Sequence, residues 1–162
     1  MKNKVIFLCT GNICRSPMGE ALLKHAIVAR PKTSPIHSLE IVSAGTSAVD
    51  GMPPSANSVS ALVRVGIDIS SYRATSLTQS MLDECYALFA MSRSHLEEVK
   101  NFYKNPPERM FTVCQMIPDC QHPDIPDPYG GTLSEYIDVR DEIARAIPHI
   151  VKYLEHELKK NS

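Results

Sequence analysis

The chain has 162 residues, of which 43% are hydrophobic and 22% are charged, and its formal net charge is −1. This composition is typical of a globular protein with a real core, and we expect one domain over residues 1–162. Without a basic excess the chain is not expected to bind nucleic acid or an anionic membrane surface, and its apolar runs are too short to cross a bilayer.

The first two elements are the most clearly marked. The apolar run at 4–9 predicts a buried strand, and the segment SPMGEALLKHAIVAR (16–30) predicts a helix. Ser16 is expected to cap the first turn of this helix, and Pro17 suits its first position. The polar stretch between the two elements is therefore a loop that connects a strand to a helix.

Strands and helices continue to alternate along the chain. A continuous apolar run such as CYALFAM is typical of a strand covered on both faces. The C-terminal segment has apolar residues at spacings of three and four, which indicates an amphipathic helix that Pro148 is expected to kink. The remaining expected elements are a strand at 40–43, a helix at 53–65 ended by Gly66, strands at 85–91 and 110–114, a helix at 92–103 and a proline-rich loop at 115–131.

This alternation predicts an α/β fold. Because parallel strands are joined by crossover helices, we expect a Rossmann-like, four-stranded parallel sheet with helices on both faces. Ligands of such sheets bind at the carboxyl ends of the strands. The loop after the first strand is therefore the first place to look for a site.

The loop 9–17 reads CTGNICRSP, and its residue types suit an oxyanion. Five residues between Cys9 and Arg15 can wrap inward-pointing amides around one tetrahedral anion at a helix N-terminus. Arg15 adds a planar fork for two of the oxygens. Gly11 and Asn12 tolerate the left-handed backbone that such a loop requires. The loop is therefore predicted to bind phosphate.

Cys9 lies at the base of this predicted anion site. A cysteine at a strand end is usually inert, but the field that binds phosphate also stabilises a thiolate, which is a nucleophile towards phosphorus. The Ser16 hydroxyl is expected to donate to that sulfur and to ease its departure. The odd total of five cysteines does not suit a disulfide scaffold and favours a reducing, cytoplasmic compartment.

The sequence resembles the low-molecular-weight protein tyrosine phosphatases. CTGNICRSP resembles their signature loop, and Asp127-Pro128-Tyr129-Gly130 resembles their late Asp-Pro-aromatic loop. The chain is also similar in length and in the Ser-Ala-Gly-Thr run at 43–46. Two catalytic motifs in the right order extend the resemblance over essentially the whole chain.

The resemblance implies a phosphatase that hydrolyses phosphotyrosine in protein substrates through phosphocysteine on Cys9. Arg15 and the amides of the loop would hold the phosphate, and Asp127 would act as general acid and then as base. No metal or cofactor is implied, and we expect a monomer or weak dimer. Further implied roles are substrate contacts by Thr10, Gly11, Asn12, Ile13, Cys14 and Tyr129, ring walls from Ile13 and Tyr129, loop bracing by Asn12 and Ser43, and a reversible disulfide of Cys14 with the nucleophile.

Some residues depart from the family pattern or compete with it. The family often has a histidine that holds the loop asparagine, and here Tyr72 or Ser71 occupies that region. Asp124 lies close to Asp127 but is not followed by Pro-Tyr-Gly, so it is not expected to be the acid. Cys114 and Cys120, with His122 close by in the sequence, could bind a metal or form a redox pair, but their spacing fits no standard zinc pattern. We therefore do not expect a functional role for them, and a redox role is left open.

Three alternative functions remain open. An arsenate reductase of this fold would need further cysteines after the third strand, and MSRSHLEEVK contains none. Protein arginine phosphatases of the family carry threonine at the position of Ile13, where isoleucine favours a flat aromatic ring. A phosphate-binding module without catalysis would be expected to lose Cys9, Arg15 or Asp127, and all three are present.

Overall fold

The computed structural model describes residues 1–161 and contains a four-stranded parallel sheet. The strand order is β2-β1-β3-β4, so the first strand lies inside the sheet with a neighbour on each side. Its Leu8 lies level with Ala44 of one neighbour and Ala90 of the other. The strands are β1 (Lys4–Cys9), β2 (Glu40–Gly45), β3 (Cys85–Ala90) and β4 (Met110–Thr112).

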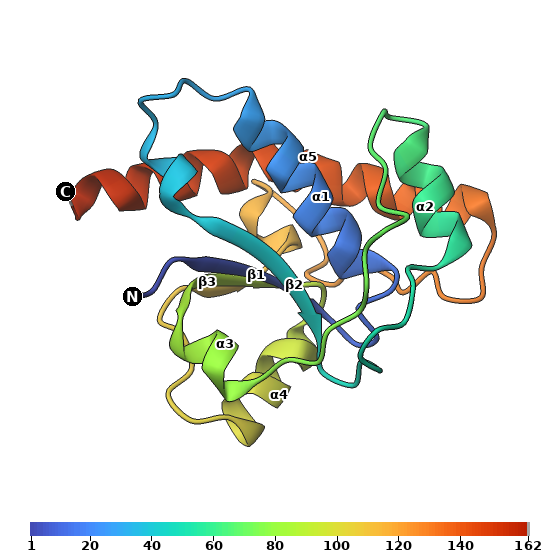
Figure 1. Ribbon diagram of the computed structural model, residues 1–162, viewed down its shortest axis with the longest axis horizontal. Helices are drawn as coiled ribbons and strands as arrows, with labels where there is room; N and C mark the ends of the chain where they lie inside the picture. Colours follow the sequence, from blue (N-terminus) through green and yellow to red (C-terminus); the bar gives the residue numbers. More distant parts are fainter. Residues whose placement is uncertain (162) are drawn as a thin grey trace.

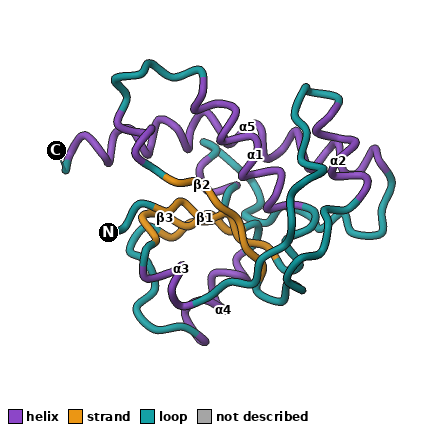
Figure 2. The backbone as a smooth tube through the Cα atoms, viewed as in Figure 1, coloured by secondary structure: helices purple, strands orange, loops and turns teal. Residues whose placement is uncertain are grey.

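Helices cover both faces of the sheet, which confirms the predicted fold class (Figures 1 and 2). The long C-terminal helix lies on the same face as the helix that follows β1, and the two smaller helices around β3 lie on the opposite face. On the first face are α1 (Arg15–Val28), α2 (Ala56–Val63) and α5 (Leu133–Lys160), and on the second are α3 (Gln79–Asp83) and α4 (Arg93–Phe102).

The hydrophobic core has two parts, one on each face of the sheet, because successive side chains of β1 point to opposite faces. Val5 and Phe7 pack under α1 and α5, whereas Ile6 and Leu8 face the side of α3 and α4, and all four are fully buried. Full burial of one such side chain contributes about 1.5–3 kcal/mol. A strand that is buried on both faces has a continuous run of apolar residues, and the sequence of β1 shows such a run.

The N-cap predicted at Ser16 is wrong. The first helix begins at Arg15, its N-cap is Cys14, and no side chain of residues 1–161 caps it. Ser16 is fully buried, and its hydroxyl lies 2.8 Å from the sulfur of Cys9. The hydroxyl therefore contacts the sulfur of Cys9 and not the backbone of its own helix.

Several boundaries differ from the expectation by a few residues. The second strand continues through Ala44 to Gly45, because the chain stays paired with β1 up to Cys9. The fourth strand is shorter than predicted, and Cys114 begins a 3-10 turn, Cys114–Met116. The expected helix at 53–65 is the shorter α2, which starts after Ser55. Two short elements had no clear signal in the sequence, namely α3 and the 3-10 turn Pro35–Ser38.

The last helix is continuous from Leu133 to Lys160 and contains Pro148. Its apolar stripe is buried against the sheet as the spacing predicted, with Ile143, Ile147 and Ile150 in the core. Across residues 1–161, helices long and apolar enough to span a membrane are not found.

Candidate active site

The loop between β1 and α1 wraps back over the end of β2. Asn12 has a φ of 58°, so the left-handed position falls on the asparagine and not on Gly11. Gly45 lies directly beneath the loop: a Cβ there would lie 2.4 Å from the carbonyl oxygen of Thr10 and 3.0 Å from the amide nitrogen of Asn12. The next amide, of Thr46, donates to the carbonyl of Cys9 at 2.9 Å. The loop conformation thus depends on a residue without a side chain at the end of β2.

The sulfur of Cys9 receives two polar contacts. Its Sγ lies 2.8 Å from the Oγ of Ser16, and the amide of Asn12 donates to it at 3.3 Å. The side-chain amide of Asn12 in turn donates to the Ser16 oxygen at 2.8 Å, and the Ser16 hydroxyl also donates to the carbonyl oxygen of Ala44 at 3.5 Å. The sulfur of Cys9 is thus within hydrogen-bond distance of one hydroxyl and one backbone amide.

The side chain of Asn12 is the centre of the loop bracing. It is fully buried behind the loop, so any substrate contact at this residue comes from its backbone. Its Nδ2 donates to Ser43 Oγ at 3.0 Å, and its Oδ1 accepts from the hydroxyl of Tyr72 at 2.6 Å and from the amide of Thr75 at 2.8 Å. Tyr72, and not Ser71, therefore makes the contact that the family often assigns to histidine.

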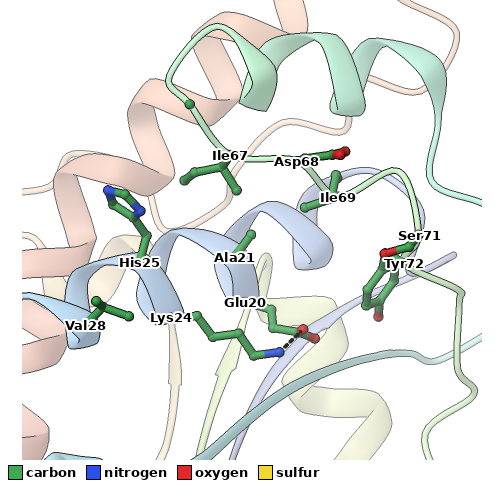
Figure 3. Close-up of a pocket in the computed structure, with 11 residues that line it drawn as sticks. Glu20, Ala21, Lys24, His25, Val28, Ile67, Asp68, Ile69, Ser71 and Tyr72 are labelled. Carbon is green, nitrogen blue, oxygen red and sulfur yellow. Dashed lines mark hydrogen bonds and ion pairs between the residues drawn. The ribbon is translucent and has the colours of Figure 1, made fainter.

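Figure 3 shows Glu20 on the helix α1 and Tyr72 on the segment after α2. Both side chains contact Ser43 of β2. The Ser43 hydroxyl donates to Glu20 Oε1 at 2.9 Å and lies 2.5 Å from the Tyr72 oxygen, while Lys24 pairs with the same carboxylate at 2.8 Å. Burial raises the pKa of Tyr72 to about 12, so its hydroxyl remains a neutral donor to the loop. No pattern in the sequence had indicated the role of Glu20.

His95 is a site residue that the sequence reasoning missed. It lies in the first turn of α4 and is 2% exposed. Its Nε2 lies 2.9 Å from Thr10 Oγ1 and its Nδ1 lies 2.8 Å from Ser92 Oγ. Burial, followed by the charge of Arg15, lowers the pKa of His95 to about 4. The imidazole is therefore neutral near pH 7 and positions Thr10. Its position shortly after the carboxyl end of β3, where ligands of such sheets bind, was the sequence feature that could have indicated a role.

Arg15 joins the loop to the segment that carries the predicted acid. Its guanidinium is almost completely buried, and Nη1 donates to the carbonyl of Ile125 at 2.9 Å. Its Nη2 lies 3.7 Å from Oδ2 of Asp127, whose side chain is half exposed. The other carboxylate oxygen of Asp127 accepts the amide of Tyr129 at 3.1 Å. The two motifs of the sequence are thus adjacent in the fold.

Asp124 has a different place. Its Oδ1 accepts the amide of Arg93 at 2.9 Å, at the N-terminus of α4. It does not line the cavity that holds Cys9 and Asp127. The geometry is therefore compatible with the choice of Asp127 as the acid.

A cavity of about 280 Å³ opens above the loop. Arg15 and Cys9 lie among its polar lining, while the rim contains the exposed side chains of Val49, Met52 and Tyr129. The apolar rim from 47–52 was not anticipated, because nothing marks that loop in the sequence. The lining residues are Cys9, Thr10, Gly11, Ile13, Cys14, Arg15, Ser47, Val49, Met52, Asp127 and Tyr129.

Cys14 lines the same cavity but has different surroundings from Cys9. Its sulfur lies 3.3 Å from Ser55 Oγ and 3.4 Å from the hydroxyl of Tyr136. Burial raises the pKa of the Cys14 thiol, which therefore remains protonated and does not compete as a nucleophile. Within the described chain, the group of residues with metal-ligand spacing lies elsewhere, at Cys114, Cys120 and His122.

Comparison with known proteins gives one consistent result. The model of the family "Low molecular weight phosphotyrosine protein phosphatase" matches residues 4–161. The chain is 29% identical to a protein-arginine-phosphatase of Geobacillus stearothermophilus, over 97% of the chain and 99% of that protein. It is 29% identical to a probable low molecular weight protein-tyrosine-phosphatase, EpsP, of Ralstonia nicotianae, over 91% and 92%.

A solved structure shows the same similarity. The low molecular weight protein tyrosine phosphatase from T. tengcongensis superposes with a TM-score of 0.81 at 32% identity. The match covers 94% of this chain and 99% of that one.

Proposed function

Because the chain belongs to the low molecular weight phosphotyrosine protein phosphatase family, we propose that it hydrolyses phosphotyrosine in protein substrates, with Cys9 as the nucleophile. One observation carries this proposal. The sulfur of Cys9, the guanidinium of Arg15 and the carboxylate of Asp127 line one cavity of about 280 Å³. A nucleophile, an oxyanion ligand and a proton donor are what a phosphate monoester requires.

In the first step the Cys9 thiolate attacks phosphorus while the bond from phosphorus to the tyrosine oxygen breaks. The loop amides and Arg15 hold the equatorial oxygens, where charge is spread in the transition state. Asp127 gives its proton to the departing phenolate, which leaves poorly without it. The products are the dephosphorylated tyrosine side chain of the protein substrate and phosphocysteine on Cys9.

In the second step water attacks the phosphocysteine. Asp127, now a carboxylate, takes a proton from the water, the bond from sulfur to phosphorus breaks, and the products are inorganic phosphate and the Cys9 thiolate. The Ser16 hydroxyl and the Asn12 amide lie 2.8 and 3.3 Å from that sulfur, and donation from both to the departing thiolate lowers the energy of its departure. The step needs no metal ion, because Arg15 and the amides supply the positive field.

The contact between Arg15 and Asp127 gives the free enzyme a defined resting arrangement. At 3.7 Å the carboxylate is a partner for Arg15 Nη2. A bound phosphate group would replace it there, since a phosphate accepts a bidentate guanidinium better. The released Asp127 carboxylate can then take up a proton from the solvent and turn towards the leaving oxygen.

The apolar rim supports phosphotyrosine as the substrate. Ile13, Val49, Met52 and Tyr129 surround the opening and suit a flat aromatic ring. Phosphoarginine is the second candidate, because the chain is 29% identical to a protein-arginine-phosphatase over nearly its whole length. Turnover of matched phosphotyrosine and phosphoarginine peptides distinguishes the two.

Arsenate reduction and phosphate binding without catalysis receive less support. A reductase would require a resolving cysteine on α4, and this helix contains none. A binding module would not need Asp127 beside Arg15.

We also propose that Cys14 forms a reversible disulfide with Cys9 under oxidation and that the protein works in the reducing cytoplasm. Both sulfurs line the cavity, which supports the disulfide. The odd number of cysteines, all of them free, supports the compartment. The expected monomer or weak dimer stays a prediction.

The decisive experiment measures phosphate release from a phosphotyrosine peptide, with EDTA present, for the wild type and Cys9→Ser in parallel. Release by the wild type alone is the expected result. Release by both proteins would exclude Cys9 as the nucleophile. Binding of the peptide by the wild type without release would make the protein a binding module.

A further inference from the structure

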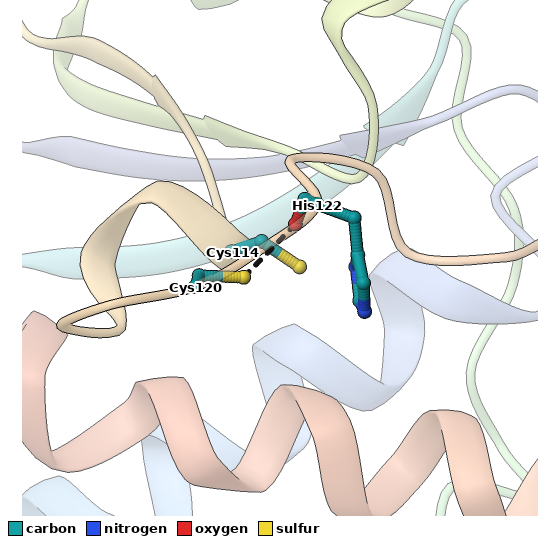
Figure 4. A group of neighbouring side chains, drawn as sticks. All are labelled: Cys114, Cys120 and His122. Carbon is teal, nitrogen blue, oxygen red and sulfur yellow. Dashed lines mark hydrogen bonds between the residues drawn. The ribbon is translucent and has the colours of Figure 1, made fainter.

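A second cluster of polar side chains lies outside the catalytic cavity, in the segment between β4 and Asp127. Cys114, Cys120 and His122 each offer one ligand atom, and these atoms lie within 4.8 Å of one another (Figure 4). Glu142 joins them from α5. Its Oε1 lies 3.5 Å from His122 Nδ1 and 3.6 Å from Cys114 Sγ. We call these four residues the Cys114 cluster.

Two separations in the Cys114 cluster, both to Glu142, match the edges of a zinc tetrahedron. Bonds of about 2.0–2.3 Å from Zn²⁺ to sulfur, nitrogen and oxygen give edges of about 3.3–3.8 Å. Both measured distances to Glu142 fall in this range. The ligand atoms of Cys114, Cys120 and His122 lie within 4.8 Å of one another, so their separations need to close by no more than about 1.5 Å, which side-chain rotations provide. The Glu142 carboxylate, which lies outside that group of three, must also turn towards Cys120.

The donor set selects the type of ion. Two thiols and an imidazole are ligands for zinc and other borderline or soft metals, whereas Mg²⁺ and Ca²⁺ take oxygen ligands. Such a mixed set also differs from a simple thiol pair, because a disulfide would use neither His122 nor Glu142. The sequence spacing alone did not reveal the set, since its fourth member comes from a distant helix.

Burial gives an independent reason for a cation. The side chain of Glu142 is only 13% exposed, and among residues 1–161 the basic group within ion-pair distance is His122, which is 62% exposed. Cys114 is fully buried beside the same carboxylate. A buried carboxylate normally has a well-placed positive partner. A divalent cation at the centre of the cluster supplies one.

We propose that Cys114, Cys120, His122 and Glu142 bind one Zn²⁺ ion. Binding converts both thiols to thiolates and releases two protons to the solvent, while His122 coordinates as a neutral imidazole. No electrons are transferred. Glu142 contributes a carboxylate oxygen, so the four ligands complete a closed, structural type of site with no open position for chemistry.

The position of the site indicates what the ion does. Cys114 follows β4, Glu142 belongs to α5, and Cys120 and His122 lie on the loop between them. This loop continues to Ile125, whose amide donates to Met91 and whose carbonyl accepts from Arg15. The ion therefore connects the start of the segment that carries Asp127 to α5. It holds this segment at one end, and Arg15 holds it farther along, at Ile125.

The test uses a Cys9→Ser background, because the reactive thiolate would itself bind soft metals. Reduced, metal-free protein is titrated with Co²⁺ and then with Zn²⁺. We expect one equivalent of Co²⁺ with a thiolate-to-metal charge-transfer band and the intense visible bands of tetrahedral cobalt, both lost when Zn²⁺ displaces it. At about 100 times its Kd, Zn²⁺ should raise Tm by about 5–10 °C.

The variants change the two ligands that are exposed or half-exposed, because substitutions at such positions are not expected to unfold the protein. Cys120→Ser and His122→Ala should each weaken binding by more than about 100-fold, beyond the loss typical of residues that only support ligands. The matched controls are Cys85→Ser, a buried cysteine of β3, and His149→Gln, a half-exposed histidine of α5. Both should bind Co²⁺ like the parent.

Three results would overturn the proposal. One is the absence of tight, tetrahedral Co²⁺ binding by the reduced protein. Another is binding that survives Cys120→Ser but is lost in Cys85→Ser. The third is a Cys114–Cys120 disulfide that forms readily while the reduced pair binds no metal, which would identify a redox pair. None of these readouts depends on phosphatase activity, so they are independent of the proposed function.

Discussion

The hydroxyl of Tyr72 donates to Oδ1 of Asn12 at 2.6 Å, and this contact connects the segment after α2 to the phosphate-binding loop. Asn12 is in the left-handed region, where its side chain must be held for the loop to keep its shape. Tyr72→Phe removes the donor and leaves the asparagine oxygen with the amide of Thr75 alone. We expect a loss of about 0.5–1.5 kcal/mol in stability and a fall in kcat/KM for a phosphotyrosine peptide.

Tyr72→His is the matched control for that prediction. A histidine retains a hydrogen-bond donor at the same position and should recover part of the activity that phenylalanine loses. Equal activity of the phenylalanine variant and the wild type would show that the contact does not shape the loop.

Asp127→Ala should slow hydrolysis of a phosphotyrosine peptide by about 10²–10⁴-fold, because the phenolate then leaves without a proton. An aryl phosphate with a good leaving group needs the acid far less, so its kcat should fall much less. Steady-state kinetics on both substrates measure the difference. Asp124→Ala is the control, since that carboxylate accepts the amide of Arg93 outside the cavity. Equal losses of kcat on both substrates would mean that Asp127 is not the general acid.

His95 should make stability depend on pH. Its folded-state pKa is lowered to about 4 from 6.5, so the unfolded chain binds a proton more readily. The contribution of neutral His95 to the free energy of unfolding is fully present above pH 6.5. It is lost as pH falls from about 6.5 to about 4, and the total loss is up to about 3 kcal/mol. Urea unfolding between about pH 4 and pH 7 measures it. His95→Gln should flatten the pH dependence, and a slope that is the same in both proteins would contradict the assignment.

Cys14 should protect the nucleophile from peroxide. Peroxide oxidises the Cys9 thiolate to a sulfenic acid, which condenses with the Cys14 thiol to a disulfide and releases water. Treatment with peroxide and then with dithiothreitol should restore activity in the wild type. Cys14→Ser should recover much less, because sulfinic acid forms instead. Full recovery by the serine variant would exclude this function, and Cys85→Ser serves as the control.

Ile13→Thr tests the choice of substrate. Isoleucine contributes an apolar wall to the cavity, and threonine replaces part of that apolar side chain by a hydroxyl. We expect kcat/KM for phosphotyrosine to fall and the ratio of phosphoarginine to phosphotyrosine turnover to rise. A constant ratio would mean that the specificity depends on other rim residues, such as Val49 and Met52.

The sequence was informative where function depends on neighbours along the chain. Cys9 and Arg15 belong to one short loop, so their residue types and spacing were enough to nominate them. Asp127 was nominated by the resemblance of its motif to the late loop of the family. The predicted strands were recognised because burial on both faces leaves an uninterrupted apolar run. The Ser16 cap failed for a tertiary reason, since its hydroxyl contacts a sulfur seven residues away.

Residues that act across the fold were harder to find. His95 reaches Thr10 over 85 residues, and Glu20 reaches Ser43 from another element. Neither contact can be inferred from the spacing of the residues along the chain, because both contacts depend on how the helices pack on the sheet. The apolar rim at Val49 and Met52 was missed because loop residues carry no periodicity.

The close approach of Gly45 to the loop has a consequence for binding. The backbone of Thr10 and Asn12 rests on the end of β2, and the following amides donate to Cys9 and Thr10. The conformational entropy of this loop is thus lost during folding and not at each encounter with a ligand. An arriving phosphate meets amides that already converge, so association should resemble docking to a rigid receptor, with little change in loop hydrogen exchange.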